Sequence, residues 1–313
     1  MTDASSQPPD GAGRRRARRT RARADFDQAN ERIKQRTGRD LIGAVLIGLV
    51  IGAVLLLSLL IWKPVFVVFV LAAGTTGVFE LSRALQASGR RVDLVPQLLG
   101  LVGMLASAWF LELWQHWVLV CAAVVLVVVW RLLAQLLRHD GRTASAIWDD
   151  VLVAVLIPLY VSFAASLAVI LLRQEDGEWW VLAFIIIAIV ADTAAYASGL
   201  SFGKHPMAPR ISPKKTWEGF AGAVIGALVA GILLAQFMLQ LPWATGLILG
   251  AVILLTATLG DLGESMIKRD LGIKDMSSWL PGHGGVLDRL DSILPSAGAA
   301  LALYYLLTPL VTQ

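Results

Sequence analysis

Long apolar runs separated by short polar segments constrain the fold of this sequence more than any other feature. A helix needs about 20 apolar residues to cross the roughly 30 Å hydrocarbon core of a bilayer. Runs of about that length occupy 41–62, 64–80, 95–112, 117–137, 149–172, 179–199, 218–239, 243–262 and 293–311. Hydrophobic residues make up 57% of the 313 residues and charged residues only 16%, more apolar surface than a soluble domain of this size could bury. We therefore expect an all-α, polytopic membrane protein with about nine transmembrane helices.

The distribution of basic residues predicts how these helices are oriented. Eleven of the 27 Lys and Arg residues precede Leu41. If the N-terminus is cytoplasmic, only Lys63 and Arg173 fall outside and the other 25 lie inside, which is the asymmetry of the positive-inside rule. We expect a protein of the cell membrane whose longest polar loops face the cytoplasm. The pI near 9.4 then reflects topology, and no nucleic-acid partner is expected.

The chain divides into a polar arm and a membrane domain. Residues 1–40 include the run Arg14 to Arg19 and have too few apolar side chains to offset the entropy of ordering, so we expect a disordered cytoplasmic arm. Such an arm either only sets the topology or also lies against anionic lipid. Residues 41–313 are expected to form one multi-span domain, with its catalytic half at about 180–300.

Acidic residues within the apolar runs are candidates for a functional site. Asp192 lies near the inner end of the sixth run, where a carboxylate is costly unless it faces a partner or a wet cavity. Tyr196 shares its helical face at i,i+4 spacing. Glu80, at the end of the second run, is a second carboxylate that should face a partner or a wet cavity.

The first long inner loop carries a pattern typical of a helix start. Ser212 and Pro213 would be the N-cap and the first helical residue. Lys214 and Lys215 would then occupy the first turn, where cations are unfavourable unless an anion is also bound. We therefore predict that Ser212, Lys214 and Lys215 bind phosphate.

The second inner loop concentrates acids, bases and glycines. If the eighth run continues as a helix, Asp261, Glu264, Ser265 and Lys268 form one polar stripe, and Asp288, Asp291 and Ser292 repeat the same spacing where the ninth run begins. Between them, the glycines around His283 allow backbone N–H groups to approach phosphate closely. Two carboxylate-bearing helix ends near several cations would hold Mg²⁺ and a polyphosphate together. His283 is expected to contact phosphate, since Mg²⁺ prefers oxygen ligands.

This loop resembles the signature of the phosphatidate cytidylyltransferase family, which reads S-x-x-K-R, then K-D, then P-G-H-G-G-x-x-D-R-x-D. The matching residues are Ser265, Lys268, Arg269, Lys274, Asp275, the run Pro281 to Gly285, Asp288, Arg289 and Asp291. The stretches around Asp192 and from Ile211 to Gly219 also look like the family, so the resemblance covers about residues 180–300.

The resemblance implies that the chain joins CTP to phosphatidate, giving CDP-diacylglycerol and pyrophosphate for phospholipid biosynthesis. It implies Mg²⁺, with the number of cations left open, and a homodimer in membrane lipid with a cavity facing the cytoplasm. Asp261 and Asp288 would bind the metal, with Asp192 as a further candidate. The expected catalytic residues are Lys268, Arg269, His283, Arg289 and Asp291, and the expected substrate-binding residues are Ser212, Lys214, Lys215, Ser265, Lys274, Gly284 and Gly285.

Two other functions compete with this interpretation. A CDP-alcohol phosphotransferase would be similar in size and metal use, but its D-G-x-x-A-R motif is not found in the sequence. A transporter for an anionic metabolite would account for Asp192 and the basic inner loops. Transporters usually show repeat symmetry in both halves, whereas here the polar features gather in one half.

Overall fold

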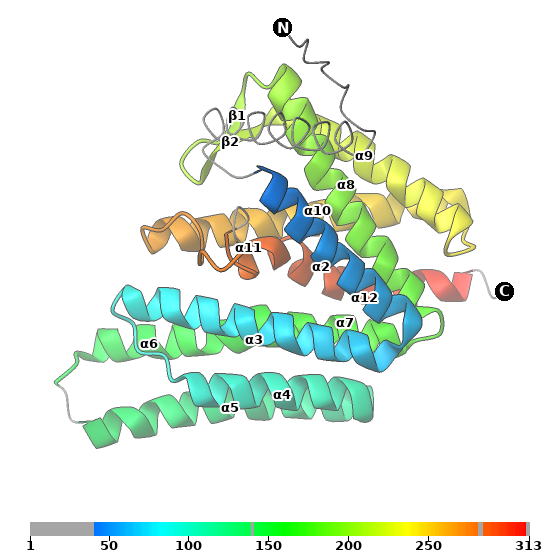
Figure 1. The fold of residues 1–313 in the computed structure, drawn as a ribbon. Coiled ribbons are helices and arrows are strands. Elements are labelled where there is room, and N and C mark those ends of the chain that lie inside the picture. The colour runs from blue at the N-terminus through cyan, green and yellow to red at the C-terminus, as the bar shows by residue number, and fades with distance from the viewer. Residues whose placement is uncertain (1–40, 139–140, 281–283, 311–313) are drawn as a thin grey trace, which may run out of the picture.

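The structure is a computed structural model, and it describes residues 41–138, 141–280 and 284–310 (Figure 1). The predicted arm at 1–40 and the predicted site residue His283 lie outside the described residues. The described chain is almost entirely helical. One short antiparallel hairpin, β1 (Pro206–Ala208) and β2 (Ser212–Thr216), is the exception to the predicted all-α class.

The N-terminal half supplies the first group of helices. They are α2 (Leu41–Ile61), α3 (Lys63–Ala87), α4 (Leu94–Phe110), α5 (Leu113–Arg138), α6 (Ala144–Ile157) and α7 (Ala164–Arg173). In this group, α3 to α7 run alongside one another and α2 crosses at an angle (Figure 1). A π-helix at Pro158–Phe163 joins α6 to α7 in one continuous rod. Proline cannot donate the backbone hydrogen bond of a regular helix, and π-turns of this kind are frequent near functional sites.

The C-terminal half supplies the second group. It comprises α8 (Gly177–Phe202), α9 (Trp217–Phe237), α10 (Trp243–Asp270), α11 (Leu287–Leu290), α12 (Ile293–Leu307) and a 3₁₀ turn at Thr308–Leu310. Helix α9 packs along both α8 and α10, and α12 contacts α7, α8 and α10 and so joins the two groups. The approach of α9 to α10 requires glycine, because a Cβ on Gly246 would lie 2.5 Å from the carbonyl oxygen of Gly231.

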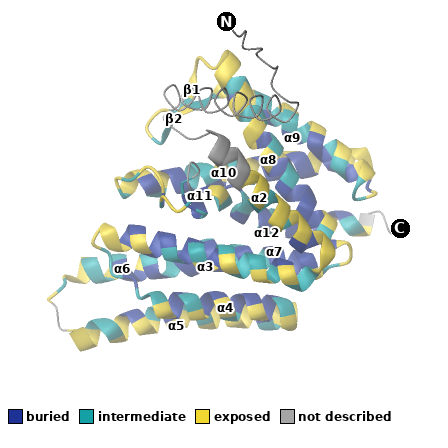
Figure 2. Cartoon of the chain, viewed as in Figure 1, coloured by how far each residue is buried: buried dark blue, intermediate teal, exposed yellow. Residues whose placement is uncertain are grey.

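Most predicted apolar runs coincide with helices that could span a bilayer. Seven helical segments in the described part of the chain are long and apolar enough, namely Lys63–Ala87, Leu113–Arg138, Ala144–Arg173, Gly177–Phe202, Trp217–Phe237, Trp243–Asp270 and Leu287–Leu307. The run 95–112 corresponds to the shorter apolar helix Leu94–Phe110, and the run 41–62 corresponds to the 21-residue helix α2, which includes the apolar segment Gly48–Ile61. Exposed side chains cover the outer faces of the helices, and buried side chains line the contacts between them (Figure 2). In α5, far more side chains are exposed than buried. The chain is therefore an all-α polytopic membrane protein.

The predicted helix start at Ser212 is wrong. Residues 212–216 are extended and pair with β1, and the helix begins at Trp217, after an N-cap at Thr216 whose Oγ1 accepts a hydrogen bond from the Gly219 N–H at 3.1 Å. The steric demand of Pro213 on the residue before it favours an extended Ser212, and threonine is itself a good N-cap. The two lysines that follow Pro213 therefore lie on a strand, and the argument from the helix dipole does not apply to them.

Candidate functional site

A cavity of about 670 Å³ lies where β2 and helices α8 to α11 meet. Its volume is in the usual range for small-molecule sites. One part of its wall is apolar and includes Leu200, Phe220 and Leu254, and the remainder is densely charged. The charged residues in the wall are Asp192, Asp261, Asp275, Asp288, Asp291, Lys214, Lys215, Lys268 and Arg289. The cavity thus brings together charged residues from both predicted loops and from the sixth run.

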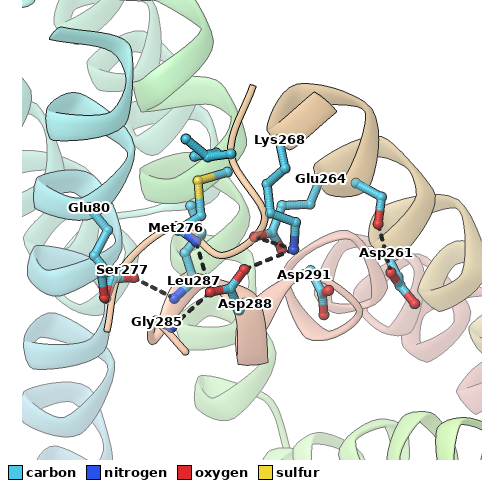
Figure 3. Close-up of polar contacts among 12 residues, drawn as sticks. Glu80, Asp261, Glu264, Lys268, Met276, Ser277, Gly285, Leu287, Asp288 and Asp291 are labelled. Atoms are coloured by element: carbon cyan, nitrogen blue, oxygen red, sulfur yellow. Dashed lines mark hydrogen bonds and ion pairs between the residues drawn. The ribbon is translucent and has the colours of Figure 1, made fainter. Parts of the chain in front are cut away.

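Lys268 and Asp288 form a buried ion pair in the wall of this cavity. The Nζ atom of Lys268 lies 2.8 Å from Oδ1 of Asp288 and 3.3 Å from Oε1 of Glu264 (Figure 3). Lys268 is 9% exposed, Asp288 6% and Glu264 0%. The prediction that α10 continues as a helix through Lys268 is confirmed, and this continuation is what presents the lysine to Asp288.

The second oxygen of Asp288 organises the glycine-rich loop. Its Oδ2 accepts hydrogen bonds from the backbone N–H groups of Met276, at 2.9 Å, and Gly285, at 2.7 Å. Gly284 has a φ of +82°, a conformation that favours glycine, and a Cβ there would come within 2.9 Å of the same oxygen. The two glycines predicted to approach phosphate are therefore also held against Asp288.

Asp261 pairs with a lysine from the hairpin. Its carboxylate forms an ion pair with Lys215 on β2 and accepts a long hydrogen bond of 3.4 Å from the Oγ of Ser265, one turn later on α10. The strand conformation of residues 212–216 lets Lys215 reach α10. Lys214 also lines the cavity.

Asp192 and Asp291 complete the acidic part of the wall. Asp291 accepts hydrogen bonds at Oδ1 from the N–H of Ser292, at 2.7 Å, and from its hydroxyl, at 3.3 Å. Asp192 projects from α8 and interacts with Ser292, Lys215 and Asp261. The negative charges of Asp192, Asp261 and Asp291 also act on one another, so this side of the cavity attracts cations.

Six predicted site residues in the described part of the chain do not line the cavity, namely Ser212, Ser265, Arg269, Lys274, Gly284 and Gly285. Arg269 donates from Nε to the carbonyl oxygen of Ile211, at 3.2 Å, and from a terminal nitrogen to that of Ile273, at 3.3 Å, so it fastens the hairpin and the next loop to α10. Lys274 is exposed, and Ser212 is half-buried in the β2 ladder. The roles predicted for Arg269, Lys274 and Ser212 in the site stay predictions.

The structure adds residues that the sequence argument did not select for the site. Glu264, the buried second partner of Lys268, was part of the polar stripe but received no role, and Asp275 entered only as a motif position. Tyr160 belongs to the π-helix. Its buried hydroxyl has no hydrogen-bond partner among the described residues and interacts electrostatically with Glu264 and Asp291. The proline at the start of the π-helix was its only sequence signal.

The acidic side chains suit Mg²⁺ by type, although they do not form a complete ligand set by themselves. Within the described residues, no three His, Cys, Asp or Glu side chains converge as a metal site. Mg²⁺ usually takes one or two carboxylates and fills its other positions with water and substrate phosphates. The like charges of Asp192, Asp261 and Asp291 meet that requirement. Two backbone N–H groups occupy Oδ2 of Asp288, so a metal ion there would bind at Oδ1, beside the ammonium of Lys268.

Comparisons with known proteins agree with the resemblance of the loop signature. The sequence model of the cytidylyltransferase family matches residues 42–307. Phosphatidate cytidylyltransferase of Mycobacterium bovis is 42% identical over 280 residues, which cover 85% of this chain and 88% of that protein. The Mycobacterium leprae protein of the same name is 39% identical over 281 residues, covering 87% and 90%. The Haemophilus influenzae protein of that name is 46% identical over 122 residues, covering 37% of this chain. The match extends well beyond the signature into the N-terminal helices, and the chain belongs to the cytidylyltransferase family.

Proposed function

We propose that this membrane enzyme transfers CMP from CTP to phosphatidate, giving CDP-diacylglycerol and pyrophosphate for phospholipid biosynthesis. An oxygen of the phosphatidate phosphate attacks the α-phosphorus of CTP. A new P–O–P linkage forms, and the bond between the α-phosphorus and the oxygen that bridges to the β-phosphate breaks, so pyrophosphate leaves with that bonding pair. The observation that carries the proposal is the single cavity that holds four cations beside five carboxylates and is partly walled by apolar side chains.

The reaction requires stabilisation of phosphate charge more than it requires proton transfer. The phosphate monoester of phosphatidate is largely dianionic near neutral pH, because its second pKa is about 6. It can attack without a strong general base, but two anions must be brought together in line and the charge moving onto pyrophosphate must be stabilised. Lys214, Lys215, Lys268 and Arg289 are the cavity cations that can bind phosphate oxygens.

Mg²⁺ is part of the proposal. When bound, it would neutralise phosphate charge and polarise the bond to the leaving group. Asp261, together with Asp192 and Asp291, would hold the ion. Asp288 remains a predicted ligand, and it would bind the metal through Oδ1, the oxygen that contacts Lys268.

The membrane arrangement is also proposed. We infer nine spans, a cytoplasmic N-terminus and a cavity open to the cytoplasm at the plasma membrane, and the charge asymmetry of the inner and outer segments supports this orientation. The apolar part of the cavity wall lets the acyl chains stay in lipid while the head group enters. We further propose a homodimer, as the family resemblance implies; the mass of the purified protein–detergent complex tests it.

The reaction is tested with purified full-length protein in detergent, supplied with phosphatidate, Mg²⁺ and each nucleoside triphosphate in turn. We expect a CDP-lipid and an equal amount of pyrophosphate with CTP and Mg²⁺, and no product when phosphatidate is omitted. The absence of a cytidylylated lipid from folded protein would refute the proposal. Uptake of labelled CTP into sealed vesicles without pyrophosphate release would instead favour the transporter.

A further inference from the structure

Glu80 is a buried carboxylate that no step of the reaction uses. It lies near the end of α3 and is 2% exposed. A carboxylate removed from water is strongly destabilising unless hydrogen-bond donors surround it. The hydrogen-bond donors around Glu80 should therefore indicate its role.

Among the described residues, three groups donate hydrogen bonds to Glu80, and they come from the loop between α10 and α11 and from the first residue of α11, about two hundred residues later in the chain. Its Oε1 accepts the hydroxyl of Ser277, at 2.5 Å, and the N–H of Val286, at 3.0 Å, and its Oε2 accepts the N–H of Leu287, at 2.8 Å. Figure 3 shows Glu80 on α3 facing Ser277 and Leu287, with Asp288 on the far side of the loop. The side chain of Glu80 thus links the N-terminal half of the molecule to the segment that precedes Asp288.

Glu80 and Asp288 divide the donors of this loop between them. Asp288 accepts the N–H groups of Met276 and Gly285, while Glu80 accepts from the next residue on each side, Ser277 and Val286. Each carboxylate therefore ties the beginning of the loop to its end. Because Leu287 directly precedes Asp288, a displacement of the Glu80 contacts would move the carboxylate that pairs with Lys268.

The close approach of Glu80 also accounts for one glycine. A Cβ on Gly285 would lie 2.7 to 2.9 Å from the carboxylate atoms of Glu80. Gly285 has no positive φ, so its backbone would accept alanine, and the obstacle is the Glu80 carboxylate itself. Any side chain at 285 would force that carboxylate away from its three donors.

We infer that Glu80 is a positioning residue for the cytidylyl transfer. It fixes residues 276–277 and 285–287 so that Asp288 stays aligned with Lys268, and it couples α3 to the active-site loop. Glu80 is not in the cavity wall and touches no substrate in this role. The inference rests on the proposed function for its kinetic consequence, but not for its structural one.

The first test compares Glu80→Gln with the wild type in detergent. Gln keeps the size of the side chain but turns an NH₂ group toward a backbone N–H, so one contact becomes repulsive. We expect kcat to fall roughly 10- to 100-fold, as the loss of a charge-assisted hydrogen bond implies, with KM for CTP and phosphatidate changing less than twofold. Amide hydrogen exchange should become faster in peptides covering 284–290 and stay unchanged in α4 and α5. The matched control is Glu178→Gln, which removes a carboxylate paired with Lys63 at the other end of α3, 2.7 Å away, and should behave as the wild type.

The second test is a double-mutant comparison at Gly285. Gly285→Ala alone should be strongly impaired, whereas Gly285→Ala should cost much less in a Glu80→Ala background, because the obstructing carboxylate is gone. If Gly285 is glycine only to admit a phosphate, the alanine is equally harmful in both backgrounds and the inference is overturned. If Glu80→Gln does not fold, Ser277→Ala removes a single contact, and we expect roughly fivefold lower kcat and faster exchange at 284–290.

The failures of the two proposals can be told apart. If the folded wild-type protein makes no CDP-lipid, the proposed function is refuted. The hydrogen-exchange measurement would still report on the contacts of Glu80. An active wild type with unchanged kcat and unchanged exchange in folded Glu80→Gln would remove the positioning role alone.

Discussion

Replacing Lys268 by methionine separates its structural contribution from its catalytic one. Methionine keeps the length of the side chain but removes the charge that lies between Asp288 and Glu264, at 2.8 and 3.3 Å. Because all three residues are buried, the substitution leaves two carboxylates facing each other without a counter-ion. Breaking a buried pair of this kind costs about 3–5 kcal/mol of stability.

The expected phenotype of Lys268→Met therefore has two parts. The thermal midpoint in detergent should fall by several degrees, and kcat should fall roughly 10- to 150-fold if the ammonium also stabilises charge that develops on pyrophosphate. Addition of Glu264→Gln removes one of the unpaired carboxylates. The double variant should recover much of the stability and little of the activity.

Three measurements decide the matter: the thermal midpoint, pyrophosphate release and conversion of labelled CTP into lipid, each on the single and double variants. Lys63→Met serves as the control. It removes an ion-paired lysine at the first residue of α3, and this variant should retain turnover. If the double variant regains wild-type kcat along with its stability, Lys268 is only a counter-ion for Asp288. The assignment of a catalytic role would then be refuted.

Four further predictions follow from the same contacts. Asp261→Asn should raise the Mg²⁺ concentration needed for half-maximal rate at least 10-fold, whereas an unchanged Mg²⁺ dependence would exclude Asp261 as a ligand. Lys215→Ala should mainly raise the KM for phosphatidate, since we propose that Lys215 holds the phosphate of that substrate; a change in kcat alone would contradict this. Thr216→Val removes the N-cap of α9 and should destabilise the protein by about 1 kcal/mol, measured as a lower thermal midpoint; a midpoint equal to that of the wild type would show that the cap contributes nothing. A reporter fused to the C-terminus should be active only outside the cytoplasm, and cytoplasmic activity would rule out an odd number of spans.

Periodicity and length predicted the helices well because membrane spans obey a simple rule. An apolar run must continue for about 20 residues, and its ends are marked by charge, tryptophan or proline. The extension of α10 through Lys268 was also predictable, because its polar residues keep helical spacing beyond the apolar run. Seven of the nine runs correspond to helices in the described residues that are long and apolar enough to span a bilayer, and α4, with 17 residues, is shorter.

Errors arose where local rules competed. Ser212 followed by Pro213 fits an N-cap, but the same proline favours an extended Ser212, and Thr216 offers a second cap nearer to the apolar run. Pairing with Pro206–Ala208 decided between them, and such pairing has no local sequence signal. The contacts of Glu80 were beyond prediction for the same reason, since they join segments about two hundred residues apart.

Ion pairing between the cations and the acids of the cavity explains how so many charges can gather in one cavity. Lys268 pairs with Asp288 and Lys215 with Asp261, so without substrate these two lysines and two aspartates neutralise one another within the wall. Unpaired charges at this depth would be costly, and ion pairs reduce that cost. On binding, substrate phosphates can replace the aspartates as partners of the lysines, and a metal ion can replace the lysines as partner of the aspartates. The number of unpaired charges therefore need not rise. On this reasoning CTP and the metal should bind more tightly together than either does alone. Equal affinity of the folded protein for CTP with and without Mg²⁺, measured by calorimetry, would show that the pairs are not exchanged.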